Sequence, residues 1–262
     1  MSRFTRHAAL GFRWLGCGGR LLWRNPWLFC GMGLCAAVIV SVLALIPLIG
    51  GSLIACVAPI MLASYYLTID RVSKSSVPLP PRLRVAAMKQ SPRELFSVFR
   101  DEKRIIPMVI VSLYCMVMSL VTNTFVWLIA GSAWTKPLAS LGLAALLGVL
   151  AAIVFALAAY FLLAISVIYA LPRAFLRGKP LFPEIPRSLK AGLHYLVALL
   201  TVLGVLLVPT LIGIVAARAS LWLSYALPML SNAVVLPLVF ASLYCSYRTI
   251  FPSTPGGQRS SG

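Results

Sequence analysis

The feature of this sequence that most restricts its fold is a series of long apolar runs without any Asp, Glu, Lys or Arg. A helix of about 20 such residues crosses the hydrocarbon core of a bilayer, and length separates helix from strand where periodicity cannot. The six runs are Trp27–Leu48, Ser52–Ile69, Ile105–Ile129, Leu138–Leu171, Leu193–Ala216 and Leu221–Ser246. We therefore predict an all-α polytopic membrane bundle of six transmembrane helices, with basic amphipathic helices at the interface on the cytoplasmic side.

The composition agrees with an integral membrane protein: 61% of residues are hydrophobic and only 11% are charged, whereas soluble domains are about a quarter charged. The net charge is +18. In a soluble chain such an excess would favour nucleic acid, but here the cations border the apolar runs, so no nucleic-acid partner is expected.

The distribution of charge predicts the orientation. Of 23 Lys and Arg residues, 21 lie in the N-terminal segment, in 70–104, in 172–192 or after the last run, together with all five acids. Only Lys136 and Arg218 lie in the other connections. By the positive-inside rule the basic side is cytoplasmic, which predicts a multi-pass protein of a bacterial inner membrane with both termini in the cytoplasm.

The whole chain, 1–262, is predicted to be one membrane domain. Its parts are an interfacial helix (1–26), hairpin one (27–69), a cytoplasmic basic loop (70–104), hairpin two (105–171), a cytoplasmic loop (172–192), hairpin three (193–248) and a flexible tail (249–262). The longest run would reach about 50 Å as a helix, against a core of about 30 Å, and must tilt or project. Its small residues, Ala144, Gly148, Ala152 and Ala156, suggest a close-packing ridge at the centre of the bundle, or chance spacing in an Ala-rich span.

The N-terminal segment is too long and too aromatic for a signal peptide, so we expect it to be retained and to lie flat in the interface. Four arginines fall within about 40° of one another on a helical wheel: Arg6, Arg13, Arg20 and Arg24. The far side carries Phe12, Leu15, Leu22 and Trp23. Four glycines in the segment oppose helix formation, at about 1 kcal/mol each, so the membrane would have to supply the ordering. Asn25 and Pro26 are predicted to cap and begin the first span.

A second basic segment, 91–104, reads as a similar helix. Ser91, Pro92 and Glu94 form a capping box, and Arg93, Arg100 and Arg104 repeat the spacing of the N-terminal arginines. Both sets could instead be topogenic charge alone. The segments "ASYYLTIDR" (63–71) and "ASLYCSYRTI" (241–250) also look alike, which leaves internal duplication as an open hypothesis.

Nothing in the sequence predicts catalysis. The six cysteines form no CxxC pair and have no clustered His, so we expect apolar filler rather than a disulfide or a metal site. The spans lack ionisable Asp, Glu, Lys or Arg, and His194 is expected to be a plain interfacial residue. No enzyme activity, cofactor or metal is predicted. Polar side chains in the spans read either as interhelical hydrogen-bonding groups or as the lining of a cavity: Asn123, Thr124, Ser231 and Asn232.

Three motifs carry a family resemblance: "GFRWLGCGGRLLWRNPWLF", "LIPLIGG" and "ASLYCSYRTIF". With these the chain resembles an uncharacterised family of proteobacterial integral membrane proteins, over nearly its whole length. Thr249 departs from the acidic residue more usual after Arg in the closing motif. The resemblance implies a bacterial inner membrane and six spans, and it implies no activity, ligand or site.

Two functions remain open. The first is a non-catalytic membrane protein whose cytoplasmic arginine face binds anionic lipid or an acidic partner. The second is a carrier or flippase-like protein that passes a lipid or neutral solute through a cavity near Asn123 and Asn232. The lack of charge inside the spans argues against ion coupling and favours the first.

Overall fold

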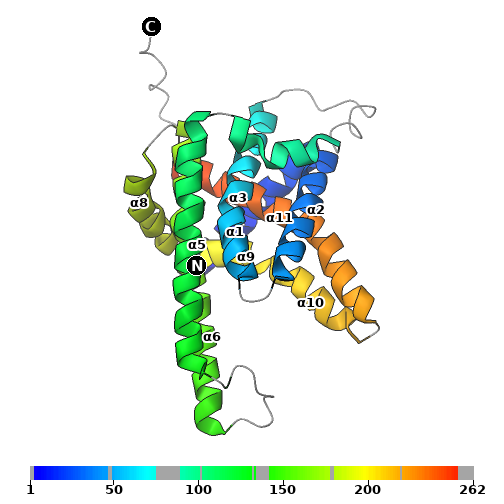
Figure 1. Cartoon of the computed structure of the whole chain (residues 1–262). Helices are drawn as coiled ribbons and strands as arrows, with labels where there is room; N and C mark the ends of the chain where they lie inside the picture. The colour runs from blue at the N-terminus through cyan, green and yellow to red at the C-terminus, as the bar shows by residue number, and fades with distance from the viewer. Residues whose placement is uncertain are drawn as a thin grey trace.

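The computed structural model describes residues 3–46, 49–74, 89–100, 102–131, 133, 142–177, 180–218 and 220–252, and every regular element within these ranges is a helix (Figure 1). The predicted all-α class is therefore confirmed. In chain order the helices are α1 (Arg3–Arg24), α2 (Pro26–Ala44), α3 (Gly50–Lys74), the 3₁₀ turn η1 (Ser97–Arg100), α5 (Glu102–Ala130), α6 (Leu143–Ile168), α7 (Ala170–Arg177), α8 (Leu181–His194), α9 (Leu196–Gly204), α10 (Leu207–Ala216) and α11 (Leu221–Ile250).

Among the described residues, six helical stretches are long and apolar enough to span a membrane, one for each predicted run. They are α2, α3, α5, α6 with α7, α9 with α10, and α11. The predicted junction between the first two segments is also confirmed, because Pro26 is the first residue of α2 and Asn25 precedes it. Asn25 makes no side-chain capping bond and is instead buried.

Two of the predicted spans are interrupted. The fourth run is helical to Ile168 and turns at Tyr169, and only its last two residues, Ala170 and Leu171, enter the short helix α7, which continues to Arg177 through the start of the predicted loop. The fifth run divides into α9 and α10 at 205–206, where the Leu206 amide bonds back to the Leu203 carbonyl, three residues earlier. Such tightening is 3₁₀-like and replaces the regular α-helical bond.

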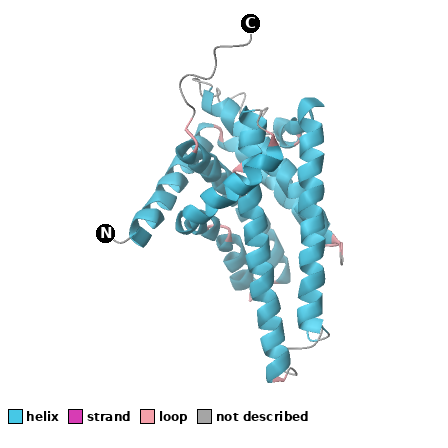
Figure 2. Ribbon diagram, turned by 90° about the vertical axis from the view of Figure 1, so that its left-hand side faces the viewer, coloured by secondary structure: helices cyan, strands magenta, loops and turns pink. Residues whose placement is uncertain are grey.

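The prediction that the fourth span is the centre of the bundle is wrong. Only 6% of the most apolar 18-residue stretch of this span is buried, the smallest share among the six spans. Helices α5 and α6 form a hairpin that projects beyond the rest of the molecule (Figures 1 and 2). Part of the small-residue ridge packs closely, and against α5: Ala152 is fully buried and a Cβ on Gly148 would lie 3.4 Å from the Ile129 carbonyl oxygen, whereas Ala144 is exposed. The spacing of small residues predicts a close pair of helices, and it does not predict where that pair lies in the bundle.

Helix α1 runs through the N-terminal segment despite its glycines, and it packs against α11 and α9. Gly11 faces α9, where an added Cβ would lie 2.7 Å from the Ala198 carbonyl oxygen. Gly18 faces α11, where a Cβ would lie 2.7 Å from the Ser242 amide nitrogen. Trp14, between them on the same face, is only 2% exposed. The prediction that the membrane would have to supply the ordering of this helix is therefore wrong, because one face of α1 belongs to the protein core.

Cysteine pairing also differs from the prediction. Cys17 of α1 and Cys245 of α11 form a disulfide, with Cα atoms 6.3 Å apart, and the other four cysteines are free. The spacing of the two residues offered no signal for this pair, since they are 228 positions apart and neither belongs to a CxxC pattern. The bond reinforces the contact that Gly18 permits between the same two helices.

The core contains a group of buried tyrosines that join α3, the α6–α7 turn and α11. Tyr66 donates a hydrogen bond to the Ile168 carbonyl oxygen at 3.1 Å, and the Tyr169 hydroxyl lies 3.1 Å from the Ser246 hydroxyl. Tyr244 donates to an Asp70 carboxylate oxygen at 2.7 Å. For these tyrosines the structure bears out the interpretation of polar span residues as interhelical hydrogen-bonding groups.

Candidate functional site

The arginines predicted on α1 lie on its exposed face. Arg6, Arg13, Arg20 and Arg24 are all exposed, on a different face of the helix from the buried Gly11, Trp14 and Gly18. Within the ranges that the structure describes, none of the four has an ion-pair partner. We call these four residues the arginine row. They form a line of uncompensated positive charge on a helix fixed by its other face.

The second set of predicted arginines does not form a matching row. The segment 91–104 is helical at its start, within 89–95, turns at Phe96, forms η1 over Ser97–Arg100 and enters α5 at Glu102. Arg93 is exposed on the first piece, Arg100 belongs to η1, and Arg104 is half-buried in the first turns of α5. Since they lie on three different elements, the prediction of one interfacial helix here is wrong.

The predicted capping box in this segment is wrong for a related reason. The Ser91 hydroxyl is buried and donates a hydrogen bond to the Leu28 carbonyl oxygen at 3.1 Å, so it fixes the segment to the start of α2. Glu94 forms an ion pair of 2.9 Å with Arg71 of α3. Contacts with other helices thus replace the local capping pattern.

Three acidic side chains form ion pairs with neighbouring cations. Asp70 pairs with Lys74 at 2.7 Å, and Glu94 pairs with Arg71. Glu184, which is only 1% exposed, contacts both Arg173 and Arg187. These three carboxylates are therefore already neutralised, and the arginine row keeps its charge.

Three of the four residues predicted to line a cavity form hydrogen bonds within or between helices. Asn123 accepts a hydrogen bond from the Tyr160 hydroxyl at 2.9 Å, which links α5 to α6. Thr124 and Ser231 bond to carbonyl oxygens of their own helices, at Leu120 and Pro228, and Asn232 is half-buried in α11. None of the four lines either of the two hollows described next.

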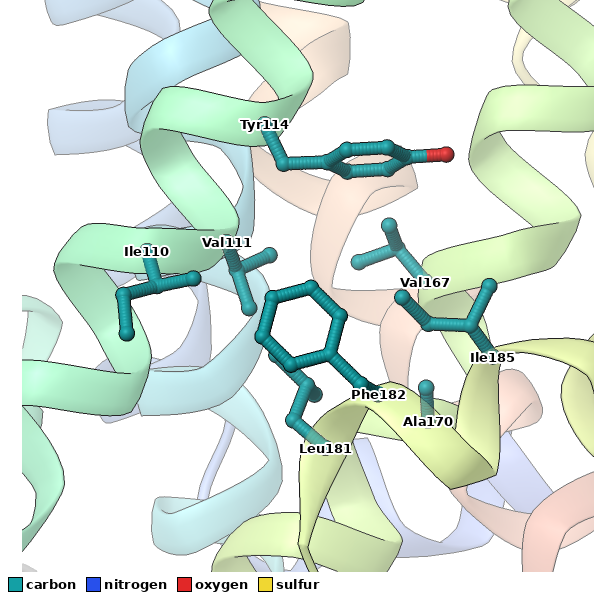
Figure 3. Close-up of a pocket in the computed structure, with 8 residues that line it drawn as sticks. All are labelled: Ile110, Val111, Tyr114, Val167, Ala170, Leu181, Phe182 and Ile185. Atoms are coloured by element: carbon teal, nitrogen blue, oxygen red, sulfur yellow. The ribbon is translucent and has the colours of Figure 1, made fainter.

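One hollow lies between α5, the α6–α7 region and α8, and Figure 3 shows its lining. Apart from the Tyr114 hydroxyl the lining side chains are hydrocarbon, with Val111, Val167 and Phe182 among them. Its volume of about 10 Å³ is close to the minimum that holds one water molecule. This hollow is a packing gap, and it is too small for a ligand.

The second hollow is a surface depression of about 500 Å³ at the junction of α8 and α9. We call it the basic depression. Its lining consists of Arg187, Lys190, Ala191, His194 and Tyr195. On α8 these residues follow the spacing of one helical face.

The two histidines of the chain meet beside this depression. The His7 ring of α1 lies 6.0 Å from the His194 ring and 5.9 Å from the Tyr195 ring, between centroids. The Nδ1 atom of His7 is buried without a hydrogen-bond partner in the described part of the chain. Sequence reasoning treated His194 as an isolated interfacial residue, and only the packing of α1 on α9 reveals its neighbour.

The described side chains offer no metal-binding chemistry: no group of three His, Cys, Asp or Glu residues that could hold a metal ion occurs among them. What the arrangement can do is bind anions, through the arginine row and the basic depression. Comparison of the chain with protein-family models, with curated protein sequences and with solved structures found no match. The family resemblance noted in the sequence therefore remains a prediction.

Proposed function

We propose that this protein is a non-catalytic, multi-pass protein of a bacterial inner membrane that binds anionic lipid through its cytoplasmic arginine face. Both termini are cytoplasmic in this proposal. The observation that carries it is the arginine row: four exposed guanidinium groups without acidic partners among the described residues, on one face of a helix held in place by the bundle. An acidic protein partner would use the same charges, and is the other outcome of the test.

The charge and donor geometry of the arginines favour lipid phosphates as the ligand. Each Lys or Arg near an anionic membrane surface contributes about 1 kcal/mol. Arginine also presents a planar fork of donors that matches phosphate oxygens. Since α2 begins directly after α1, Arg24 at the end of the row lies beside the start of the first proposed membrane span.

The test is native mass spectrometry of the protein in mild detergent with mixed phosphatidylglycerol and phosphatidylcholine. The variant Arg13→Glu/Arg20→Glu/Arg24→Glu should retain phosphatidylglycerol about a hundredfold less well, because about 3 kcal/mol of attraction is lost. The matched control compares Arg13→Glu with Arg218→Glu, which reverses one exposed charge at the α10–α11 connection. Unchanged lipid retention in the triple variant, with the helices intact by circular dichroism, would overturn the proposal.

One observation favours the alternative of a carrier or flippase: the fifth span is broken at 205–206, and interrupted helices occur at the binding sites of transporters. A scrambling assay separates the two functions. Vesicles containing this protein and a headgroup-labelled lipid are treated with an impermeant quencher. Our proposal expects the protected fraction of label to decay no faster than in protein-free vesicles.

A further inference from the structure

We propose that the basic depression binds a phosphomonoester group, carried either by a lipid of the phosphatidic-acid type or by a soluble phosphate ester. The inference rests on the proposed function, since it gives that function a preferred headgroup. It comes from a different surface, however, because the arginine row belongs to α1 and the depression to the α8–α9 junction.

The depression is rich in hydrogen-bond donors and lacks a free carboxylate. Lys190 and His194 are exposed and have no ion-pair partner within the described ranges. Arg187 uses Nη1 to contact Glu184 at 2.7 Å, yet its side chain is 62% exposed, so other guanidinium donors remain available. Glu184 itself is held in the interior between Arg173 and Arg187, so its charge does not face an incoming anion.

The number of cations favours a monoester over a diester. A phosphodiester carries one negative charge, whereas a phosphomonoester carries nearly two at neutral pH and three terminal oxygens that accept hydrogen bonds. A lysine ammonium, an arginine guanidinium and a histidine N–H can each approach a different oxygen. Zwitterionic headgroups would add a cation of their own to a site that already carries two.

The size and walls of the depression suit a headgroup with its glycerol attached. The depression is shallow and open at the surface, and its volume of about 500 Å³ leaves room for such a headgroup, unlike the apolar hollow of about 10 Å³. Tyr195 forms edge contacts with His194 at 4.8 Å and with Trp14 at 6.1 Å between ring centroids. Tyr195, with one apolar and one polar end, is of the type found at the membrane interface, and Trp14 behind it belongs to the core.

The experiment measures competition between phosphatidic acid and phosphatidylglycerol for the purified protein by native mass spectrometry. Wild type should prefer phosphatidic acid, and Lys190→Gln/His194→Gln should reduce that preference about tenfold, with general retention of anionic lipid preserved. Both positions are exposed, so the fold should persist, and Lys190→Arg should keep the preference. Glycerol 3-phosphate forms the second arm: if it competes, the phosphate ester is sufficient, and if it does not, the acyl chains are also required.

The triple reversal of the arginine row serves as the reciprocal control. It should lower retention of both anionic lipids and leave their ratio unchanged, so failure of the proposed function and failure of this inference give different results. Equal retention of the two lipids by wild type, without binding of glycerol 3-phosphate, would overturn the inference. So would an unchanged preference in the Lys190→Gln/His194→Gln variant.

Discussion

At the scale of single residues, the glycines of α1 show how a local cost can serve a distant contact. Sequence reasoning counted them against the helix, which is correct for an isolated peptide. The structure uses Gly11 and Gly18 to bring α1 against the backbones of α9 and α11. This role was not predictable, because it depends on helices more than 180 positions further along the chain.

A pair of glycine substitutions separates the two effects. In Gly18→Ala the new Cβ meets the backbone of Ser242, so we expect a loss of about 1–3 kcal/mol in unfolding free energy and a lower melting temperature. Gly16 has nothing within 4 Å of an added Cβ, so Gly16→Ala should instead gain up to about 1 kcal/mol of helix propensity. Thermal melts in detergent measure both. Equal behaviour of the two variants would contradict the close approach of α1 and α11.

Glu184 illustrates a buried charge that depends on its partners. It contacts Arg173, whose side chain is only 14% exposed and whose guanidinium carbon lies 4.5 Å from the centroid of the Phe251 ring. Arg173 is on α7, Glu184 on α8, and Phe251 follows the last residue of α11. Arg173 thus joins three segments, and Glu184 supplies its counter-charge.

The variant Glu184→Gln should destabilise the protein by about 3–5 kcal/mol, because it leaves Arg173 buried without its counter-charge. The control is Lys74→Gln, which removes the partner of Asp70 from an exposed pair and should change stability by no more than about 0.5 kcal/mol. Chemical denaturation followed by tryptophan fluorescence compares the two. A shift in Glu184→Gln as small as that of the control would show that the buried pair contributes little.

At the scale of elements, the spans were predictable and the segments between them were not. A charge-free run of sufficient length has few alternatives to a helix, since backbone groups in lipid must bond within the segment. The segment 91–104 lacks that constraint. Its Ser91 and Glu94 followed a local capping pattern, but contacts with Leu28 and Arg71 determined the outcome.

Helix α1 was half predictable for the same reason. Its polar face follows from the spacing of the arginines, and their exposure agrees with that prediction. On the side assigned to lipid, Phe12 and Trp23 are exposed, whereas Trp14, which was assigned to neither side, is in the core where α1 packs against other helices. An amphipathic pattern predicts which side avoids water or carries charge, and it does not say whether protein or lipid covers the other side.

The contact between α1 and α11 can be measured through its cysteines. Purified protein treated with a mild oxidant and then denatured should react with maleimide-polyethylene glycol at four cysteines, and at six after reduction. Cys17→Ser should show five reactive thiols without reduction, because Cys245 loses its partner. Cys30→Ser, which removes a free thiol, should show three. Six reactive thiols after oxidation of the wild type would contradict the pairing.

At the scale of the whole molecule, the arginine row was predictable because its members lie on one helix. The basic depression was not predicted, although its lining lies within 187–195, because only the structure shows a hollow at the α8–α9 junction and places His7 of α1 beside His194. The sole hint in the sequence was the spacing of Arg187, Lys190 and His194, which places three basic side chains on one helical face. Without the neighbouring helix that spacing is indistinguishable from topogenic charge.

The proposed orientation can be tested in intact bacteria. Lys89 is exposed on the basic side, so a Lys89→Cys variant should not react with a membrane-impermeant maleimide until the cells are opened. Arg218→Cys, exposed at the α10–α11 connection, should react in intact cells once the probe reaches the periplasm. Wild type supplies the background from the native cysteines. Labelling of the first variant but not the second would invert the topology, and the lipid-binding proposal would have to change with it.

The anchoring of α1 has one further consequence. Peptides that become helical only on contact with a bilayer lose part of their binding free energy to folding, and their circular dichroism spectrum changes as lipid is added. Helix α1 is already held by its packing on α9 and α11 and by the disulfide, so it does not lose free energy to folding when it binds lipid. Its guanidinium groups are therefore preorganised for phosphate binding. Titration with anionic vesicles should therefore leave the far-ultraviolet spectrum flat while lipid binds.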